Sequence, residues 1–123
     1  MLTRYAPTGA VAAANHLAAQ AGASMLDRGG NAADAAVATA AAMAVTSPHM
    51  CGLGGDLFAV VVAPGHPPAA LNASGRAGSG ADPSQLRAEG KQRMPVRDDV
   101  RSITVPGCVD GLTALNARFG SLG

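Results

Sequence analysis

The alternation of polar and apolar residues predicts a helix that begins at Asn15. Polar side chains recur at helical spacing along one side of this segment, and small or apolar side chains recur along the other. The polar side consists of Gln20, Ser24, Asp27 and Arg28, and the apolar side of Leu17, Ala18, Ala21 and Met25. Gly29 and Gly30 end the predicted helix, because glycine readily adopts the left-handed conformation found at helix C-termini.

A second helix is predicted over 32–45, and it is apolar on nearly every side. Asn31 is suited to cap its first turn. Asp34, three residues later, can accept a hydrogen bond from a free backbone amide and offset the helix dipole. Because helices without a polar face are buried, we expect this one to be covered on all sides. The two segments predict a tight helical hairpin whose alanines allow close packing.

Pro48 stops the second helix, and a glycine-rich loop follows that contains Gly52, Gly54, Gly55 and Asp56. The continuous apolar run over 57–62 is rich in β-branched residues, which predicts a strand buried on both faces. After a proline-rich turn, 69–73 predicts a second strand, antiparallel to the first.

Three shorter elements are predicted in the remaining chain. Asp82 and Pro83 are typical of a helix start, and this helix ends near Gly90. Residues 103–105 predict a weak strand. A final helix is predicted over 109–119, with one face formed by Val109, Leu112, Leu115 and Phe119. Helices that cover a sheet containing a buried hairpin indicate a layered α+β or α/β fold. Residues 1–123 show no repeat and no internal domain boundary.

Composition indicates a chain that depends on further packing. Apolar residues make up 48% of the chain, but it has one Tyr, two Phe and no Trp. A core of alanine, valine, leucine and methionine gains less per residue than one with large side chains. We therefore expect the isolated chain to be marginally stable and to pack against more polypeptide.

Charge and targeting signals narrow the possible partners. The net charge of +1 argues against binding to nucleic acid or to an anionic membrane. The mixed charges over 87–101 predict a solvated surface. We find no signal peptide and no apolar run of about 20 residues, the length that crosses a bilayer. These features favour a cytoplasmic location over export.

Several motifs are weak evidence for chemistry. The glycines of the 52–55 loop follow a helix and precede a strand, which is the reverse of a dinucleotide-binding motif, and a phosphate-loop lysine is missing. His49, Cys51 and Asp56 lack the spacing of metal ligands. Cys51 and Cys108 are predicted to be unpaired packing residues. We therefore predict neither a nucleotide nor a metal site.

Arg76 is a stronger candidate for ligand binding. It lies in a glycine-rich loop directly after a predicted strand, and loops fixed by a sheet often carry function. Its guanidinium group can bind a carboxylate through two parallel hydrogen bonds. A surface arginine in a mobile loop is the alternative interpretation.

The segments together resemble the γ-glutamyltransferase family. The string LDRGGNAADAAVA at 26–38 is similar to the family's opening helical hairpin. Further matching strings follow in the family's order, namely TSPH at 46–49, GLGG at 52–55, VPG at 105–107 and FG at 119–120. The resemblance extends from about residue 12 to residue 123.

This resemblance implies an αββα N-terminal-nucleophile hydrolase, made as a precursor that cuts itself into a large and a small subunit. The new N-terminal threonine of the small subunit is then the nucleophile, and its own α-amino group is the base. A γ-glutamyl group, usually from glutathione, passes through an acyl-enzyme to water, an amino acid or a peptide. No organic cofactor is implied. Residues 1–123 are expected to form the N-terminal part of the large subunit, inactive alone, with the rest of the precursor as partner.

Two departures from the family pattern concern the substrate. In typical members an arginine in the loop after the second strand pairs with the substrate's α-carboxylate. Ser74 falls at that position here, Arg76 lies two residues later, and Asp56 replaces a glycine as in an acylase-like branch. Arg76 and Ser74 are therefore the predicted substrate contacts. A related amidase or acylase with another acyl donor stays open, as does a small non-catalytic binding module that uses the glycine loops.

Overall fold

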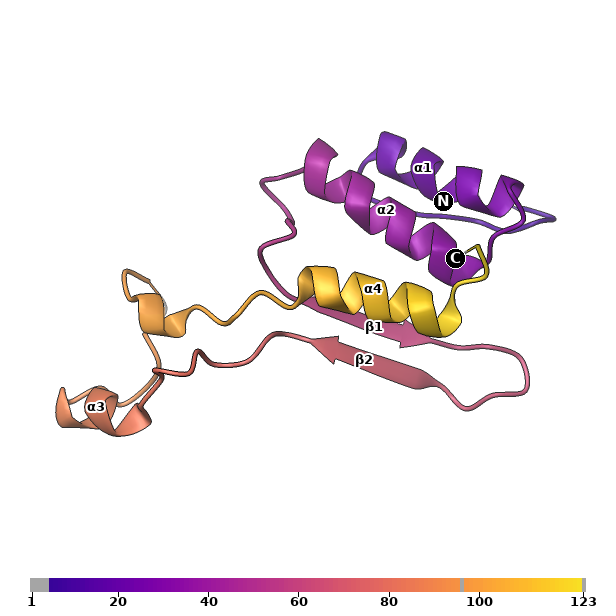
Figure 1. Cartoon of the computed structure of the whole chain (residues 1–123). Helices are drawn as coiled ribbons and strands as arrows, with labels where there is room; N and C mark the ends of the chain where they lie inside the picture. The colour runs from indigo at the N-terminus through magenta and orange to yellow at the C-terminus, as the bar shows by residue number, and fades with distance from the viewer. Residues whose placement is uncertain (1–4, 96, 123) are drawn as a thin grey trace.

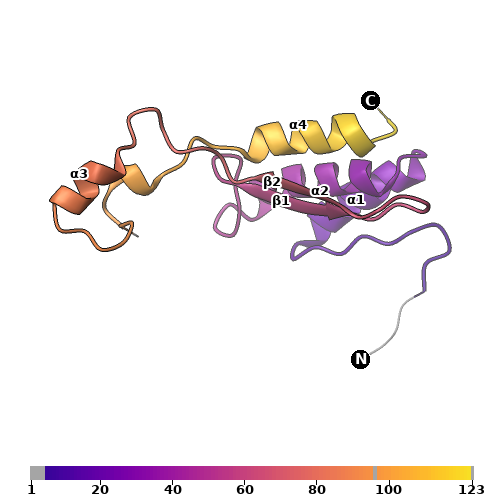
Figure 2. The same ribbon diagram turned by 90° about the horizontal axis from the view of Figure 1, so that it is seen from below.

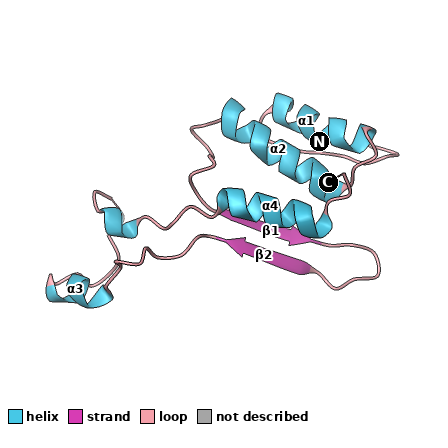
Figure 3. Ribbon diagram, in the orientation of Figure 1, coloured by secondary structure: helices cyan, strands magenta, loops and turns pink. Residues whose placement is uncertain are grey.

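The computed structural model describes residues 5–95 and 97–122. In this part of the chain, one helix covers one face of a single two-stranded sheet, and a helical hairpin packs against that helix (Figures 1 and 3). In chain order the elements are α1 (His16–Asp27), α2 (Ala32–Thr46), β1 (Leu57–Val61), β2 (Ala69–Ala73), α3 (Pro83–Ala88), the short 3-10 helix η1 (Val100–Ser102) and α4 (Cys108–Phe119).

The two N-terminal helices form the predicted hairpin, and Asn31 caps α2 as expected. The Asn15 side chain accepts hydrogen bonds from backbone amides of the first turn of α1. Asn31 and Asp34 form a reciprocal capping box at the start of α2. The polar side of α1 is exposed, and Ala18 on the other side is fully buried. Leu17 was predicted on the buried side, but it is exposed because α2 covers only part of that face.

Close contact between α1 and α2 depends on a glycine. Gly22 is buried on α1. A Cβ atom placed on it would lie 2.8 Å from the Ala35 carbonyl oxygen and would overlap the Thr39 hydroxyl of α2. The two backbones therefore approach more closely than any larger residue at this position allows.

The prediction that α2 is buried all round is wrong for this chain. Ala33, Asp34 and Ala35 are buried at its N-terminal end, whereas Val45 near its C-terminal end is 79% exposed. Beyond its contacts with α1 and α4, α2 lines one open pocket with residues 8–12 and another with the glycine-rich loop.

The strands pair in antiparallel register, with Leu57 opposite Ala73 and Val61 opposite Ala69. This confirms the predicted hairpin. Burial on both faces is wrong, because exposure alternates along both strands. One face packs under α4, and the other leaves Phe58 and Val60 64% and 74% exposed.

Helix α4 lies between the helical hairpin and the sheet (Figure 1). Its buried residues are Cys108, Gly111, Leu112 and Leu115. A Cβ atom on Gly111 would lie 2.6 Å from the Ala73 Cβ, so glycine lets the helix settle directly on β2. Val109 was predicted on the buried face, but it is 54% exposed.

Residues 77–95 and 97–104 lie in an arm that extends away from α1, α2, α4 and the sheet (Figures 1 and 2). Asp82 caps α3, as predicted. Arg101 joins the arm's two sides, donating to Glu89 at 2.8 Å and to Asp99 at 2.6 Å. Hydrogen bonds from Arg101 lower the pKa of Asp99 to about 2. The mixed charges of this region are thus partly paired within the arm.

The predicted strand over 103–105 is wrong. This segment is extended but joins no sheet. It runs back from the arm toward α4 and pairs with the loop after β2 through the Val105 amide, which donates to the Arg76 carbonyl at 2.9 Å. One such backbone bond is too few for a ladder.

Within the described residues, no helix has the length and apolar character needed to cross a membrane.

Candidate functional site

The loop after β2 is fixed by hydrogen bonds on both sides. The Ser74 amide donates to Asn72 Oδ1 at 3.1 Å, and the Thr104 hydroxyl donates to the Ser74 carbonyl at 3.0 Å. The Val105 amide donates a third hydrogen bond, to the Arg76 carbonyl oxygen. Because these bonds use backbone groups of the loop, the side chains of Ser74 and Arg76 stay available for a ligand.

Two glycines bring this loop against the start of α4. Gly75 has a φ of 80°, and a Cβ atom there would overlap the Val105 carbonyl oxygen. A Cβ atom on Gly107 would overlap the Ala73 carbonyl oxygen and lie 2.8 Å from the Gly75 nitrogen. The left-handed conformation and the backbone contact both favour glycine at position 75. The loop, the returning arm and α4 are therefore packed backbone to backbone.

An open pocket of about 350 Å³ lies at this junction. Its loop side includes Asn72, Ser74 and Arg76, and its helix side includes Asp110, Gly111 and Ala114. The structure thus brings together the two predicted substrate contacts, Ser74 and Arg76, and adds a carboxylate to them. Arg76 is exposed, and Ser74 is half-buried.

The glycine-rich loop holds α4 from its other side. Gly107, the N-cap residue of α4, has no side chain to cap the helix. The Gly55 carbonyl oxygen binds the free amides at this helix end instead. It accepts hydrogen bonds from the Gly107 amide at 3.1 Å and from the Cys108 amide at 3.0 Å. Gly52 and Gly54 have open space where a Cβ atom would stand, so no described contact requires glycine at either position.

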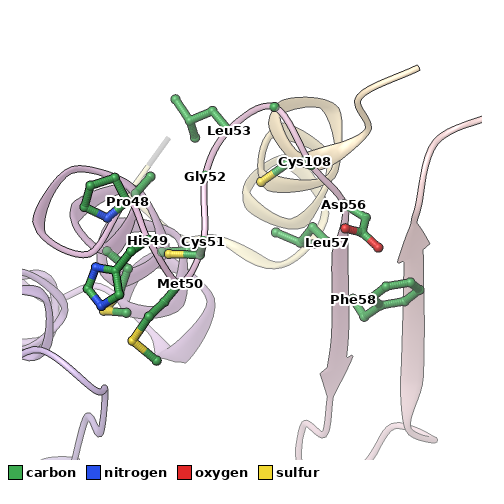
Figure 4. Close-up of a pocket in the computed structure, with 15 residues that line it drawn as sticks. Pro48, His49, Met50, Cys51, Gly52, Leu53, Asp56, Leu57, Phe58 and Cys108 are labelled. Carbon is green, nitrogen blue, oxygen red and sulfur yellow. The ribbon is translucent and has the colours of Figure 1, made fainter. Parts of the chain in front are cut away.

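A second open pocket, of about 740 Å³, lies between this loop, the end of α2 and the start of β1. Figure 4 shows Leu57 on the α4 side of β1, whereas Asp56 and Phe58 lie on the opposite side. Cys51 is exposed and Cys108 is buried, both as free thiols. Among the described residues, no His, Cys, Asp and Glu side chains gather in a group that could hold a metal ion.

The predicted hairpin residues form a structural junction at the other end of α4. Gly29 has a φ of 85°, which suits the chain reversal after α1. The side-chain amide nitrogen of Asn31 donates to the Phe119 carbonyl oxygen at 2.7 Å. A Cβ atom on Gly30 would lie 3.1 Å from Asp34 Oδ2. These residues therefore join α2 to the end of α4 and take no part in either pocket.

Asp34 is the centre of that junction and is only 5% exposed. The hydrogen bond from the Asn31 backbone amide is the largest of the effects that lower the pKa of Asp34 to about 2, and bonds from Ser121 and Leu122 add to it. Burial of the carboxylate raises the pKa and opposes these bonds. The sequence predicted the bond within α2, but nothing local to Ser121 predicted its contact with Asp34.

Sequence reasoning also missed Asp110. In the sequence it is an acidic residue in the first turn of a helix, a common position that offsets the helix dipole. Only the packing of α4 against the end of β2 shows that it shares a pocket with Arg76. The signal available in the sequence was the VPG segment at 105–107, which fixes where α4 begins.

Comparison with known proteins identifies the class. The family model described as gamma-glutamyltranspeptidase matches residues 18–123. The chain therefore belongs to the gamma-glutamyltranspeptidase family, an enzyme family, as the sequence strings predicted.

The relatives of the chain include both a glutathione hydrolase-like protein and an amidohydrolase. The chain is 43% identical over 121 residues to a glutathione hydrolase-like proenzyme of Bacillus subtilis, covering 91% of this chain and 21% of that protein. It is 46% identical over 104 residues to the oxamate amidohydrolase proenzyme of Klebsiella pneumoniae, covering 84% of this chain and 19% of that protein. The chain thus spans about a fifth of the length of these curated relatives.

A solved structure confirms the fold. The gamma-glutamyltranspeptidase of Helicobacter pylori superimposes with a TM-score of 0.85 at 30% identity, covering 98% of this chain and 35% of that one. The α+β class predicted from the sequence is therefore correct, and the described elements are part of the N-terminal-nucleophile hydrolase fold of these enzymes.

Proposed function

We propose that this chain is the N-terminal, donor-binding part of a γ-glutamyltransferase-type hydrolase. The complete enzyme transfers an acyl group from an amide donor to water or to an amino acid through a threonine acyl-enzyme. That threonine is contributed by polypeptide beyond residues 1–123. The chain forms a single unit of the large subunit, without an internal domain boundary.

The observation that supports donor binding is the rigid loop that carries Ser74 and Arg76. Its backbone is held by Asn72, Thr104 and Val105, so the two side chains need little ordering when a ligand binds. A guanidinium group can bind a carboxylate through two hydrogen bonds, and the Ser74 hydroxyl is a further donor. We assign this pair to the α-carboxylate of a γ-glutamyl donor.

A related amidase is the second candidate, favoured by the 46% identity to the oxamate amidohydrolase. Ser74 at the position of the family's arginine also supports a different donor. Oxamate carries a carboxylate that Arg76 can hold in the same way. The two candidates therefore share the carboxylate site and differ in the rest of the donor.

The proposed partner of the chain is the remainder of its precursor. The uncovered sheet face around Phe58 and Val60 and the exposed Val45 end of α2 are the surfaces it would cover. Burial of such apolar groups stabilises a fold by about 25 cal/mol per Å².

The test uses the complete precursor, with release of nitroaniline from γ-glutamyl-p-nitroanilide and of ammonia from oxamate as two assays. We expect Arg76→Ala to raise KM for the preferred donor at least about tenfold, equivalent to about 1.4 kcal/mol. Arg76→Lys should raise KM less than Arg76→Ala but still above the wild-type value, because lysine lacks the planar guanidinium group that donates two parallel hydrogen bonds.

The matched control is Arg28→Ala, which removes an exposed arginine from the polar side of α1. It should leave KM unchanged. Unchanged kinetics in Arg76→Ala would remove Arg76 from the donor site. Activity on oxamate without activity on the anilide would select the amidase.

A further inference from the structure

The two ends of the arm meet at the loop after β2 (Figures 1 and 2). Ala77, the first residue of the arm, follows Arg76 directly. At the other end, the Thr104 hydroxyl donates to the Ser74 carbonyl at 3.0 Å. The Val105 amide donates to the Arg76 carbonyl at 2.9 Å. The returning side of the arm therefore holds the loop, and the conformation of the loop depends on where that side lies.

The described arm has no apolar core that could fix its returning side. Neither α3 nor η1 has a buried residue. Met94 is 48% exposed and Val100 is 77% exposed. The backbone hydrogen bonds inside the arm are local, and the longest joins the Lys91 amide to the Leu86 carbonyl. The position of the returning side must therefore come from side chains that join the two sides.

Arg101 is the described residue that makes this connection. Its guanidinium group donates two parallel hydrogen bonds to Glu89, the C-cap residue of α3, at 2.8 and 2.9 Å. It also donates to both carboxylate oxygens of Asp99, the N-cap residue of η1, at 2.9 and 2.6 Å. One guanidinium group thus fixes the end of α3 against η1, which ends just before Thr104.

This connection is partly exposed to solvent and therefore sensitive to salt. The side chains of Arg101 and Glu89 are 30% and 47% exposed. Exposed ion pairs contribute little and are screened by salt, but a two-pronged arginine shared by several carboxylates is the geometry that does contribute. A segment with so few buried contacts opens more readily than the core. Opening of the arm would take Thr104 and Val105 away from the loop and leave the helices and the sheet in place.

We infer that Arg101 is a positioning residue for the loop after β2. By joining the two sides of the arm, it keeps the Thr104 hydroxyl and the Val105 amide on the carbonyl groups of the loop. Arg101 acts through the loop backbone and contacts no ligand in this role. The consequence for donor binding rests on the proposed function, whereas the effect on the loop does not. An ion pair that stabilises only the arm predicts no change at Val105 and none in KM.

The first measurement is hydrogen exchange of the complete self-processed enzyme, read by mass spectrometry. Arg101→Gln should speed exchange in the peptide that contains Val105, because its hydrogen bond to the loop opens with the arm. Exchange in α1 and α2 should stay at the wild-type rate. Arg93→Gln, which removes an exposed arginine of the same arm, is the matched control and should change neither rate.

A reversal of the charges provides the rescue. The double variant Glu89→Arg with Arg101→Glu should restore slow exchange at Val105, because the reversed pair again joins the two sides. Glu89→Arg alone places two arginines together and should speed exchange. If Arg101→Gln fails to process itself, Glu89→Gln, which removes one carboxylate charge only, takes its place in both measurements.

The second measurement is steady-state kinetics with the donor that the wild type prefers, either γ-glutamyl-p-nitroanilide or oxamate. Arg101→Gln should raise KM about threefold and leave kcat unchanged, because the loop is correctly placed for a smaller fraction of the time. The ratio of the KM of Arg101→Gln to that of the wild type should shrink at high salt, since salt also weakens the intact ion pairs.

The remaining outcomes separate the inference from the proposed function. Wild-type exchange at Val105 in Arg101→Gln would overturn the inference, while donor binding stands on Arg76→Ala. Faster exchange with an unchanged KM, in an enzyme in which Arg76→Ala raises KM, would also overturn the positioning role. An unchanged KM in both variants would overturn the donor-binding function and, with it, the positioning role.

Discussion

Asp34 accepts hydrogen bonds from both the backbone amide and the hydroxyl of Ser121, 87 residues further along the chain, at 3.1 and 2.8 Å. The same carboxylate accepts from the Asn31 amide at 2.7 Å and from the Leu122 amide at 3.3 Å. A residue that caps its own helix thus also fixes the chain after α4. The contact ties the start of α2 to the segment that follows the sheet-covering helix.

We expect Asp34→Asn to destabilise the complete precursor. The change replaces one acceptor oxygen by an amino group, which then faces backbone donors and leaves a buried polar group without a partner. Thermal unfolding should show a lower Tm than for Asp27→Asn, the exposed control on α1. Ser121→Ala should cause a smaller loss. The double variant should lose less than the sum of the two, because both changes break one contact.

The contribution of Asp34 should depend on pH. The folded protein lowers its pKa from the ordinary 3.8 to about 2. A carboxyl group with a lowered pKa stabilises the fold fully above the unfolded value and loses this effect as pH falls through the folded value. The stability difference between wild type and Asp34→Asn should be constant near neutral pH and shrink between about pH 4 and pH 2. Denaturant unfolding at several pH values measures this stability difference. A difference that grows on acidification would contradict the lowered pKa of Asp34.

Gly75→Ala should damage the loop that carries Ser74 and Arg76 more than a substitution at another left-handed glycine damages its own loop. Gly65, in the turn between β1 and β2, has a φ of 77° and open space where a Cβ atom would stand. Gly65→Ala should therefore cost only the conformational penalty, about 1–2 kcal/mol. Gly75→Ala adds a clash with the Val105 carbonyl and should also raise KM, since the loop must shift. Equal stability and equal KM in the two variants would show that the loop adapts without moving Arg76.

Gly22→Ala should destabilise the helical hairpin although alanine is the better helix former. The propensity gain is about 1 kcal/mol. Overpacking against a rigid neighbour costs about 1–3 kcal/mol, and the Ala35 carbonyl belongs to a helix backbone that cannot rotate away. Chemical unfolding of the complete precursor should show the net loss. Ser24→Ala on the exposed side of the same helix is the control, and a Gly22→Ala variant as stable as this control would refute the close-packing argument.

Local signals were sufficient for the positions of the α-helices and of the β1–β2 hairpin. Asn31 and Asp82 cap helices as predicted, because each cap depends on residues within one turn. Asn15, where the first helix was predicted to begin, is the N-cap of α1. The alternation on 57–61 was not visible, since every residue of the strand is apolar and only packing decides which side is covered. The 103–105 segment has β-branched residues but no partner strand, and pairing is a non-local property.

The residues of the candidate site divide in the same way. Arg76 could be proposed from the sequence because a cation in a glycine-rich loop after a strand is a local pattern. Asp110 and Ser121 were not found, because their surroundings are set by the fold. Asp110 lines the same pocket as Arg76, 34 positions earlier, and Ser121 donates a hydrogen bond to Asp34, 87 positions earlier. A sequence without aligned relatives offers no signal for such pairs.

The uncovered hairpin has a practical consequence for anyone who prepares this polypeptide. Each of its two strands has one edge whose backbone groups pair with no strand in the described chain, and Phe58 and Val60 are exposed on the uncovered face of β1. Open edges with apolar neighbours recruit further strands from any source. These open edges should make the separated 123-residue polypeptide prone to self-association, increasingly so at high concentration.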